Sequence, residues 1–255
     1  MPSSSFFWFD LMTPDIAGAR SFYGALTGWT TESMMDGAYN VIQAGSAGVG
    51  GIMSNASPDG SLPAAPPSWL GYIWVEDVDA TVARAQKLGA KQLVAARDIP
   101  GVGRFGIMQD PLGAAFAPFR PAPPPGAQHN PHMSETRGHM AWAELYTSDW
   151  QKAWQFYSAL LGWQQTEQMD MGAMGKYVLF NFGEGASVGG MMTVPNMPAQ
   201  WLFYITVDDA DAAAKKIVET GGKVVNGPMD TPGGGRAVQC SDPQGVAFGV
   251  FSHKS

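Results

Sequence analysis

The chain opens with a strand-like pattern that gives way to a helical one. Apolar and polar positions alternate with a period of two over residues 6–12, which predicts a strand. Asp15 then stands where a helix N-cap belongs, and Gly28 ends the helical pattern. The helical spacing is carried by Ala19, Phe22, Tyr23 and Leu26. Three short strands separated by glycine-containing turns are predicted next, at about 29–33, 38–44 and 48–53.

The same order of elements then restarts. A strand is predicted at 70–75, and a helix at 78–88 is closed by Gly89. Three more strands are predicted near Gln92, at 104–109 and at 114–119. The first half of the chain is therefore expected to contain two βαβββ units.

The second half of the chain repeats the first. Trp8-Phe9-Asp10-Leu11 returns as Trp142-Ala143-Glu144-Leu145, an offset of 134 residues. Asp110-Pro111-x-Gly113 returns as Asp242-Pro243-x-Gly245, an offset of 132 residues. Such constant offsets over a half-chain indicate a duplication. We expect one domain at 1–120, a proline-rich linker at 121–137 and a second domain at 138–255.

Composition narrows the classes of partner. The 22 acidic residues outnumber the 15 basic ones and give a net charge of −7, which argues against nucleic acid and anionic membranes as partners. The single cysteine, Cys240, excludes an internal disulfide. No apolar run reaches the roughly 18 residues of a membrane span, and no secretory signal pattern begins the sequence. A cytoplasmic protein is predicted.

Three motifs, each present twice and in the same order, carry a family resemblance. They are Asp15…Phe22-Tyr23…Gly28-Trp29, the helix entry Val75-Glu76-Asp77-Val78-Asp79, and the turn Asp110-Pro111-Leu112-Gly113. Together they resemble the vicinal oxygen chelate superfamily, which includes glyoxalase I, extradiol dioxygenases and bleomycin-resistance proteins. The double-length arrangement, with Trp8 on the first strand and Trp69 near the restart, is similar to a subgroup of actinobacterial secreted antigens and hydroxylase-like proteins.

The resemblance implies a fold class. An α+β protein of two tandem glyoxalase-like domains is expected, in which four βαβββ units form two open mixed β-barrels. Each barrel would enclose one ligand cavity. The internal duplication would supply within one chain the pairing that single-domain members obtain by dimerising, so either a monomer or a homodimer is compatible with the sequence.

The resemblance also implies where a metal would bind. Superfamily members with metal chemistry hold a divalent ion through His and Glu side chains on three strands of the barrel. The equivalent positions here are Trp8 and Trp142 on the first strand, Leu70 and Leu202 on the restart strand, and Ala117 and Gly249 on the last strand. None of these side chains ligates a hard or borderline metal. We therefore predict no metal and no cofactor.

A metal-dependent glyoxalase or dioxygenase remains the alternative, and it would need ligands at other positions. The four histidines fall in the linker or near strand ends, at His129, His132, His139 and His253. Solvated side chains are expected there. A metal clip formed by His129 and His132 is the competing interpretation, although their spacing lacks a helical context.

Two carboxylates are the candidate catalytic groups. Asp10 and Glu144 each follow a tryptophan by two residues, so strand geometry places each carboxylate on the same sheet face as that tryptophan. If this face lines the barrel, the carboxylate could act as a general base or accept a hydrogen bond from a ligand. Tyr39 and Tyr177 on the middle strands would assist. Alternatively, each carboxylate satisfies backbone donors or lies where the two halves meet.

A larger set of residues is predicted to bind the ligand. Tryptophans would stack on a planar molecule, methionines would offer a soft apolar surface, tyrosines would donate hydrogen bonds and arginines would hold an anion. These candidates are Trp8, Trp142, Trp69, Trp201, Met53, Met192, Tyr72, Tyr204, Arg104 and Arg236. For the aromatic and methionine residues the alternative is core packing. For the two arginines the alternative is an ion pair with Asp98 or Asp230, and Cys240 is expected to be buried and inert.

The sequence thus predicts a small-molecule partner of apolar or aromatic character, with no metal in the site. Two classes of function stay open. A binding protein needs only aromatic walls and one or two polar anchors. A metal-independent enzyme needs in addition a positioned acid or base, for which Asp10 and Glu144 are the candidates.

Overall fold

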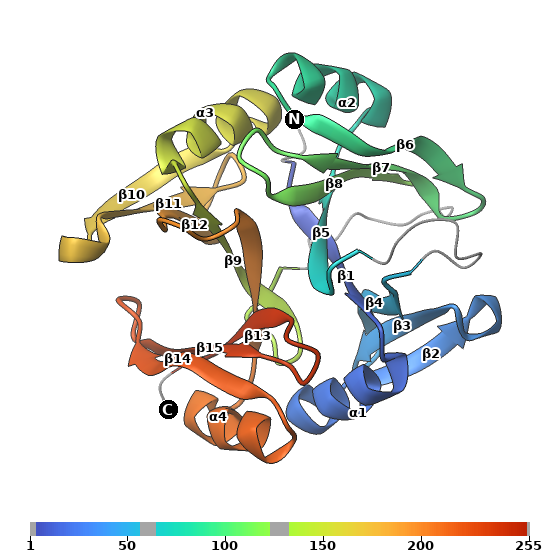
Figure 1. The fold of residues 1–255 in the computed structure, drawn as a ribbon, viewed down its shortest axis with the longest axis vertical. Coiled ribbons are helices and arrows are strands. Elements are labelled where there is room, and N and C mark those ends of the chain that lie inside the picture. Colours follow the sequence, from blue (N-terminus) through green and yellow to red (C-terminus); the bar gives the residue numbers. More distant parts are fainter. Residues whose placement is uncertain (1–3, 57–64, 123–132, 254–255) are drawn as a thin grey trace. The chain divides into compact units, whose positions relative to one another are not determined.

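The computed structural model describes residues 4–56, 65–122 and 133–253. Its elements in the first half are β1 (Phe6–Thr13), α1 (Ile16–Thr27), β2 (Thr30–Met34), the short 3₁₀ helix η1 (Met35–Gly37), β3 (Tyr39–Ala44), β4 (Ala47–Ser54), β5 (Ser68–Trp74), α2 (Val78–Lys87), β6 (Lys91–Ile99), β7 (Gly103–Gln109) and β8 (Ala115–Pro121). The order and type of these elements confirm the two predicted βαβββ units (Figure 1).

The second half repeats this series. It contains β9 (Met140–Thr147), α3 (Trp150–Leu161), β10 (Gln164–Asp170), η2 (Gly172–Met174), β11 (Lys176–Asn181), β12 (Gly189–Thr193), β13 (Gln200–Thr206), α4 (Ala210–Glu219), β14 (Lys223–Asp230), β15 (Gly235–Ser241) and β16 (Ala247–His253). The α+β class with four βαβββ units is confirmed.

Helix boundaries follow from the predicted caps. The Asp15 carboxylate accepts a hydrogen bond from the Gly18 amide at 2.9 Å and starts α1. Gly28 ends the helix with a φ of 78°, in the left-handed region that glycine enters without strain. Asp149 and Gly162 perform the same two functions for α3. The duplicated motif Asp…Gly-Trp is therefore a pair of helix caps.

The strands form two open mixed sheets of eight strands each. The first has the order β2-β3-β4-β1-β5-β8-β7-β6, and the second has the order β10-β11-β12-β9-β13-β16-β15-β14. Strands β1 and β4 pair in parallel, as do β5 and β8, whereas the hairpins are antiparallel. Each sheet ends in two edge strands, so it is not closed into a barrel.

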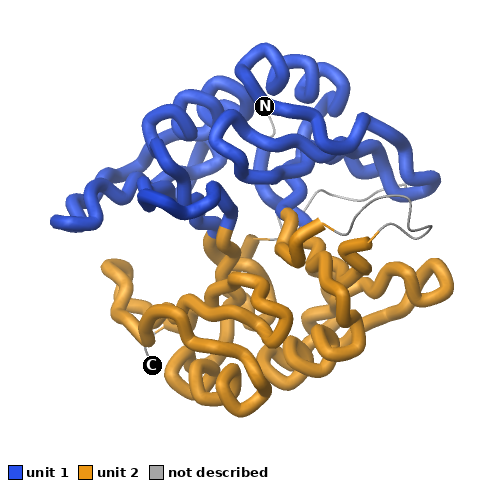
Figure 2. Tube along the Cα trace, in the orientation of Figure 1, with its two compact units in different colours: residues 1–8, 71–131, 143–201 blue, residues 9–70, 132–142, 202–255 orange. Residues whose placement is uncertain are grey.

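The contacts divide the chain into two compact units that differ from the sequence repeat (Figure 2). Unit 1 comprises residues 1–8, 71–131 and 143–201, and unit 2 comprises residues 9–70, 132–142 and 202–255. Each unit therefore combines one βαβββ unit from each half of the sequence. Helices α2 and α3 contact each other in unit 1, and α1 and α4 contact each other in unit 2. Most of the expected linker lies outside the described residues.

A buried hydrogen-bonded chain joins the two halves of the sequence inside unit 1. The Trp201 indole donates to the Tyr157 hydroxyl at 3.0 Å, and that hydroxyl donates to the Asp110 carboxylate at 3.1 Å. The other Asp110 oxygen accepts backbone N–H groups of its own turn, including that of Ala114 at 2.9 Å. Burial raises the pKa of Asp110, and the hydrogen bonds from its turn and from Tyr157 partly offset this.

Unit 2 contains the same arrangement. Trp69 donates to the Tyr23 hydroxyl at 3.1 Å, and Tyr23 donates to Asp242 at 3.2 Å. Both tyrosines are fully buried, and burial together with the nearby carboxylate raises the pKa of each phenol well above its usual value. The Phe-Tyr and Asp-Pro-x-Gly motifs of the sequence thus meet in the core, where each couples a helix from one half to a turn from the other.

Candidate functional site

The face of the sheet around Asp10 in unit 2 is the first candidate site. Asp10 on β1 is only 4% exposed, and its carboxylate accepts a hydrogen bond from the Tyr39 hydroxyl on β3 at 2.7 Å. Gly51 on β4 lies between these strands and pairs with Asp10. A Cβ atom at Gly51 would overlap both the phenol and the carboxylate. The Gly-Gly motif thus leaves space for an acid and a phenol to meet over the strand.

The surroundings of this pair are apolar and partly open. Strand register places four side chains on the same face as Asp10 and Tyr39: Met12, Met34, Val41 and Met53. Met34 is 50% exposed, and the other three are half-buried. On the opposite face, Leu11, Ile42 and Ile52 are fully buried. One face of this sheet therefore builds the core, and the other presents these apolar side chains beside Asp10 and Tyr39. The exposed Glu32, which pairs with Val41, lies on the same face.

Unit 1 has a related face around Glu144. Its carboxylate is 7% exposed and accepts a hydrogen bond from the Tyr146 hydroxyl at 2.7 Å. Gly190 pairs with Glu144, and the Tyr177 ring occupies the space that a Cβ at Gly190 would need. Met192 pairs with both Tyr146 and Tyr177. The predicted acid, phenol and methionine thus lie on adjacent strands here as well.

Tyr146 is an additional phenol beside the acid in unit 1. The 2.7 Å bond to Asp10 comes from the predicted Tyr39, and a bond of the same length to Glu144 comes from Tyr146. Tyr146 was not among the sequence candidates. It stands two residues after Glu144, so the same period of two that placed Glu144 on this face would have identified it.

Trp69 and Trp201 are placed in the core. Both are 6% exposed, and each donates its indole N–H to the buried tyrosine of its unit. The Trp69 ring lies edge-on to Tyr23 with ring centroids 5.5 Å apart. These contacts correspond to core packing, the alternative that the sequence left open for these two residues. Trp8 and Trp142 differ from them in being half-buried rather than buried.

Tyr72 and Tyr204 contact side chains of their own units. Tyr72 packs against Phe119 with a centroid distance of 5.8 Å. The Tyr204 hydroxyl accepts a hydrogen bond from the Gln239 amide at 2.9 Å. Both tyrosines are buried, with exposures of 8% and 6%. Their role in ligand binding stays a prediction.

Arg104 and Arg236 form ion pairs at the surface. Arg104 binds Asp79 at 2.7 Å and Asp98 at 3.2 Å, which includes the pairing that the sequence suggested. Its hydrogen bonds hold the pKa of Asp79 below the usual range. Arg236 binds Asp211 at 2.7 Å and Asp230 at 3.0 Å in the same manner. With two carboxylates on each guanidinium, neither arginine offers a vacant anion site.

Cys240 is buried, as expected. Desolvation raises the pKa of its thiol to about 12, so the thiolate is scarce at neutral pH. A buried, protonated thiol is a poor nucleophile.

The positions where a superfamily metal would bind are occupied by apolar groups. Leu70, Leu202 and Ala117 are buried. At Gly249, the Tyr204 ring fills the space into which any longer side chain would extend. Across residues 4–56, 65–122 and 133–253, no three or more His, Cys, Asp or Glu side chains are grouped so that they could hold a metal ion. His129 and His132 lie outside the described residues.

Sequence comparison places both halves of the chain in one family. The glyoxalase/bleomycin resistance protein/dioxygenase superfamily profile matches residues 137–250, and a glyoxalase-like domain profile matches residues 7–118. The chain belongs to the glyoxalase superfamily. It is 35% identical to the "Putative glyoxylase CFP32" of Mycobacterium bovis, over 96% of this chain and 93% of that protein. It is 31% identical to the "Anthracycline biosynthesis protein DauV" of Streptomyces sp. strain C5, over 95% of this chain and 91% of that protein.

Solved structures of the glyoxalase superfamily share the fold at low sequence identity. The Mn(II)-bound glyoxalase of Novosphingobium aromaticivorans has a TM-score of 0.69 at 15% identity, covering 99% of this chain and 83% of that one. The 2,3-dioxygenase LapB of Pseudomonas sp. KL28 has a TM-score of 0.66 at 13% identity, covering 99% of this chain and 92% of that one.

The residues at the six superfamily metal positions of this chain do not fit a divalent metal, because they are two tryptophans, two leucines, an alanine and a glycine. None of the helices in the described residues has the length and apolar character needed to cross a membrane.

Proposed function

We propose that this glyoxalase-like protein binds a small planar aromatic molecule on the sheet face around Asp10 and Tyr39, without a metal. The observation that carries the proposal is the 2.7 Å bond between a buried carboxylate and a phenol on a half-exposed apolar face. Met12, Val41 and Met53 supply polarizable contact area for a flat ring. The acid and phenol supply one acceptor and one donor that fix its orientation.

The relatives support a polycyclic aromatic ligand that carries oxygen substituents. Two Streptomyces relatives are named anthracycline biosynthesis proteins, and anthracyclines are fused aromatic rings with hydroxyl and quinone oxygens. A phenolic hydroxyl of such a ring would donate to Asp10, and the Tyr39 hydroxyl would then donate to a neighbouring quinone oxygen. The face around Glu144 and Tyr146 provides the same pair of groups and is proposed as a second site.

The same groups would serve proton transfer if the protein is an enzyme. Asp10 would accept a proton from a ligand hydroxyl or an acidic C–H, and Tyr39 would stabilise the negative charge that remains on the ligand. This chemistry needs no metal. Asp10→Asn separates the two classes of function, because an enzyme would lose turnover while retaining its ligand, whereas a binding protein would lose only affinity.

Tryptophan fluorescence titration tests the binding proposal. The probes are 1-hydroxyanthraquinone and anthraquinone, which differ by one hydroxyl group. We expect a preference of about tenfold for the hydroxylated probe, the usual contribution of one hydrogen bond to a charged group. The preference should disappear in the double variant Asp10→Asn/Glu144→Gln. An equal preference in the wild type and this variant would show that the two carboxylates do not recognise the ligand.

A further inference from the structure

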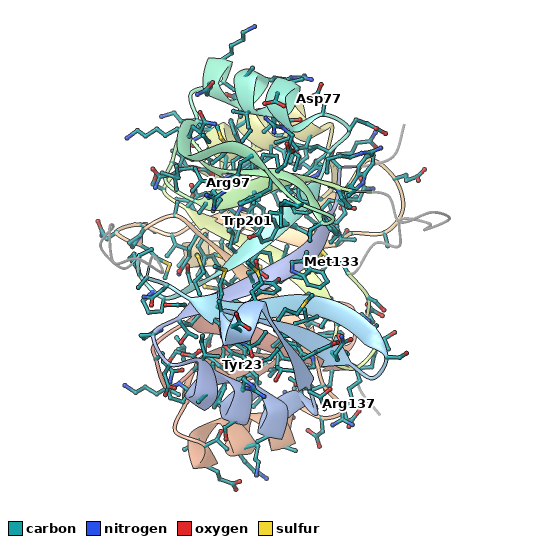
Figure 3. The ribbon with its side chains drawn as sticks, turned by 90° about the vertical axis from the view of Figure 1, so that its right-hand side faces the viewer. Tyr23, Asp77, Arg97, Met133, Arg137 and Trp201 are labelled. Carbon is teal, nitrogen blue, oxygen red and sulfur yellow. The ribbon has the colours of Figure 1, made fainter. Side chains whose placement is uncertain are left out.

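Arg97, on the edge strand β6 of unit 1, lies over an aromatic ring. It pairs in register with Phe105 across β6 and β7, and its guanidinium is 5.3 Å from the centre of the Phe105 ring. Arg97, labelled in Figure 3, is exposed. Phe105 is 6% exposed. The cation–π contact places the guanidinium over the face of the ring.

No carboxylate of the described residues forms an ion pair with Arg97. The adjacent Asp98 extends to the other face of the strand, where it binds Arg104 at 3.2 Å. Arg104 and Arg120 have acidic partners at 2.7 Å and 3.2 Å, respectively. Arg97 thus differs from these two neighbours in keeping its charge available for a ligand.

The surface beside Arg97 is aromatic and aliphatic. The Phe105 ring contacts those of Tyr72 and Phe119, with centroid distances of 6.3 Å and 6.4 Å. Val94, Ile99 and Ile107 are half-buried apolar side chains on the same face of this sheet edge. A fixed cation at the border of an apolar surface matches a ligand with a flat ring and an attached anionic group.

The second half of the sequence lacks both components. At the offset of 132 residues, Arg97 corresponds to Met229 and Phe105 corresponds to Ala237, and these two residues also pair in register on β14 and β15. The neighbouring ion pairs are retained, because Arg104 and Arg236 each bind two aspartates. The two copies therefore differ in charge and ring character at this pair, although the neighbouring arginine–aspartate ion pairs are the same in both.

We propose that Arg97 and Phe105 form a binding site for an aryl carboxylate, which the second copy of the repeat does not possess. The guanidinium binds the carboxylate through two parallel N–H···O bonds. The ring of the ligand lies along the apolar edge formed by Val94 and Ile107. This site goes beyond the proposed function, since none of its residues takes part in the face around Asp10 and Tyr39.

Binding of 2-naphthoate and its neutral analogue 2-naphthamide to the full chain tests the site. Calorimetry should show that the wild type prefers naphthoate by about tenfold, as expected for a charge-assisted bidentate contact at a partly exposed position. Arg97→Met introduces the residue of the second copy and should bring the preference to about one. Arg97→Lys keeps the charge without the planar guanidinium and should retain only part of the preference for naphthoate. Met229→Ala in the second copy is the matched control and should behave as the wild type does.

Other results would overturn the proposal. An unchanged preference in Arg97→Met would mean that Arg97 does not contact the carboxylate. Equal binding of the two probes by the wild type, or no binding of naphthoate, would exclude a site for aryl carboxylates. Circular dichroism of each variant confirms that it is folded. Repeating the titration in Asp10→Asn separates this site from the proposed function, because the naphthoate preference should persist there.

Discussion

Removal of the Tyr157 hydroxyl tests the account of the core. Tyr157→Phe keeps the ring, which stacks on Trp163 with a centroid distance of 5.3 Å and an interplanar angle of 10°. It deletes the donor to Asp110 and the acceptor of the Trp201 indole. The variant therefore isolates the contribution of two buried hydrogen bonds with little change in packing volume.

The expected loss of stability follows from the burial of both partners. Asp110 is 3% exposed and Trp201 is 6% exposed, so water replaces the lost hydroxyl poorly at either group. A hydrogen bond to a carboxylate contributes roughly 1.5–3 kcal/mol, and depriving a buried indole of its acceptor adds about 1 kcal/mol. We expect the free energy of unfolding to fall by about 2–4 kcal/mol. The Tm should decrease by roughly 5–12 °C.

Urea denaturation and calorimetry of Tyr157→Phe, Asp110→Asn and the double variant provide the assay. Because the two residues form one hydrogen bond, their effects should be non-additive by about 1 kcal/mol or more. Tyr23→Phe is the counterpart in unit 2 and should cost a similar amount, since it breaks the equivalent bonds to Asp242 and Trp69. Additive effects, or a Tm within about 1 °C of the wild type, would refute the reasoning.

Three further predictions concern pH, metal content and the Gly-Gly motif. Burial raises the pKa of Asp110 above its ordinary value of 3.8, so its contribution to stability is fully present below that value and is lost as pH rises through the folded pKa. Urea titrations of the wild type from below pH 3.8 to above the raised pKa of Asp110 should show this loss of unfolding free energy, and Asp110→Asn should abolish it. Curves of unfolding free energy against pH that run parallel for the two proteins would contradict this prediction. Protein purified without a chelator or an affinity tag should contain well under one equivalent of Fe, Mn, Ni or Zn by mass spectrometry. A full equivalent that is lost on mutating residues of the two sheets would restore the metal-dependent alternative. Gly51→Ala should destabilise the fold by about 1–3 kcal/mol, because its Cβ would overlap the Tyr39 and Asp10 side chains. An unfolding midpoint equal to that of the wild type would show that this overlap is relieved without cost.

Local chemistry made the elements of this fold predictable from sequence. Asp15 and Gly28 marked the ends of α1 because a side-chain cap and a left-handed glycine act within one turn. The sequence predicted Asp10 as the catalytic carboxylate and Tyr39 as its helper, and the two side chains are hydrogen-bonded. Duplication strengthened each assignment, since every motif was seen twice.

Long-range pairing could not be predicted in the same way. The bond between Tyr23 and Asp242 joins residues 219 positions apart, and no local pattern encodes such a contact. For Trp69 and Tyr72, strand alternation already held useful information. These residues are three apart on β5, so their side chains point to opposite faces, although both were predicted to line the ligand site. Trp69 lies against α1 through Tyr23, whereas Tyr72 lies against Phe119.

The most direct test of the central claim locates the ligand on the sheet face. Methyl NMR of protein labelled at the methionine methyl carbons, titrated with 1-hydroxyanthraquinone, reports contact at Met12 and Met53, which flank the Asp10 and Tyr39 pair. We predict that these two methyl signals shift by ring-current effects, and that Asp10→Asn weakens the shifts. Shifts confined to methionines on other strands, such as Met108 or Met229, or no shifts at any probe concentration, would contradict the proposal.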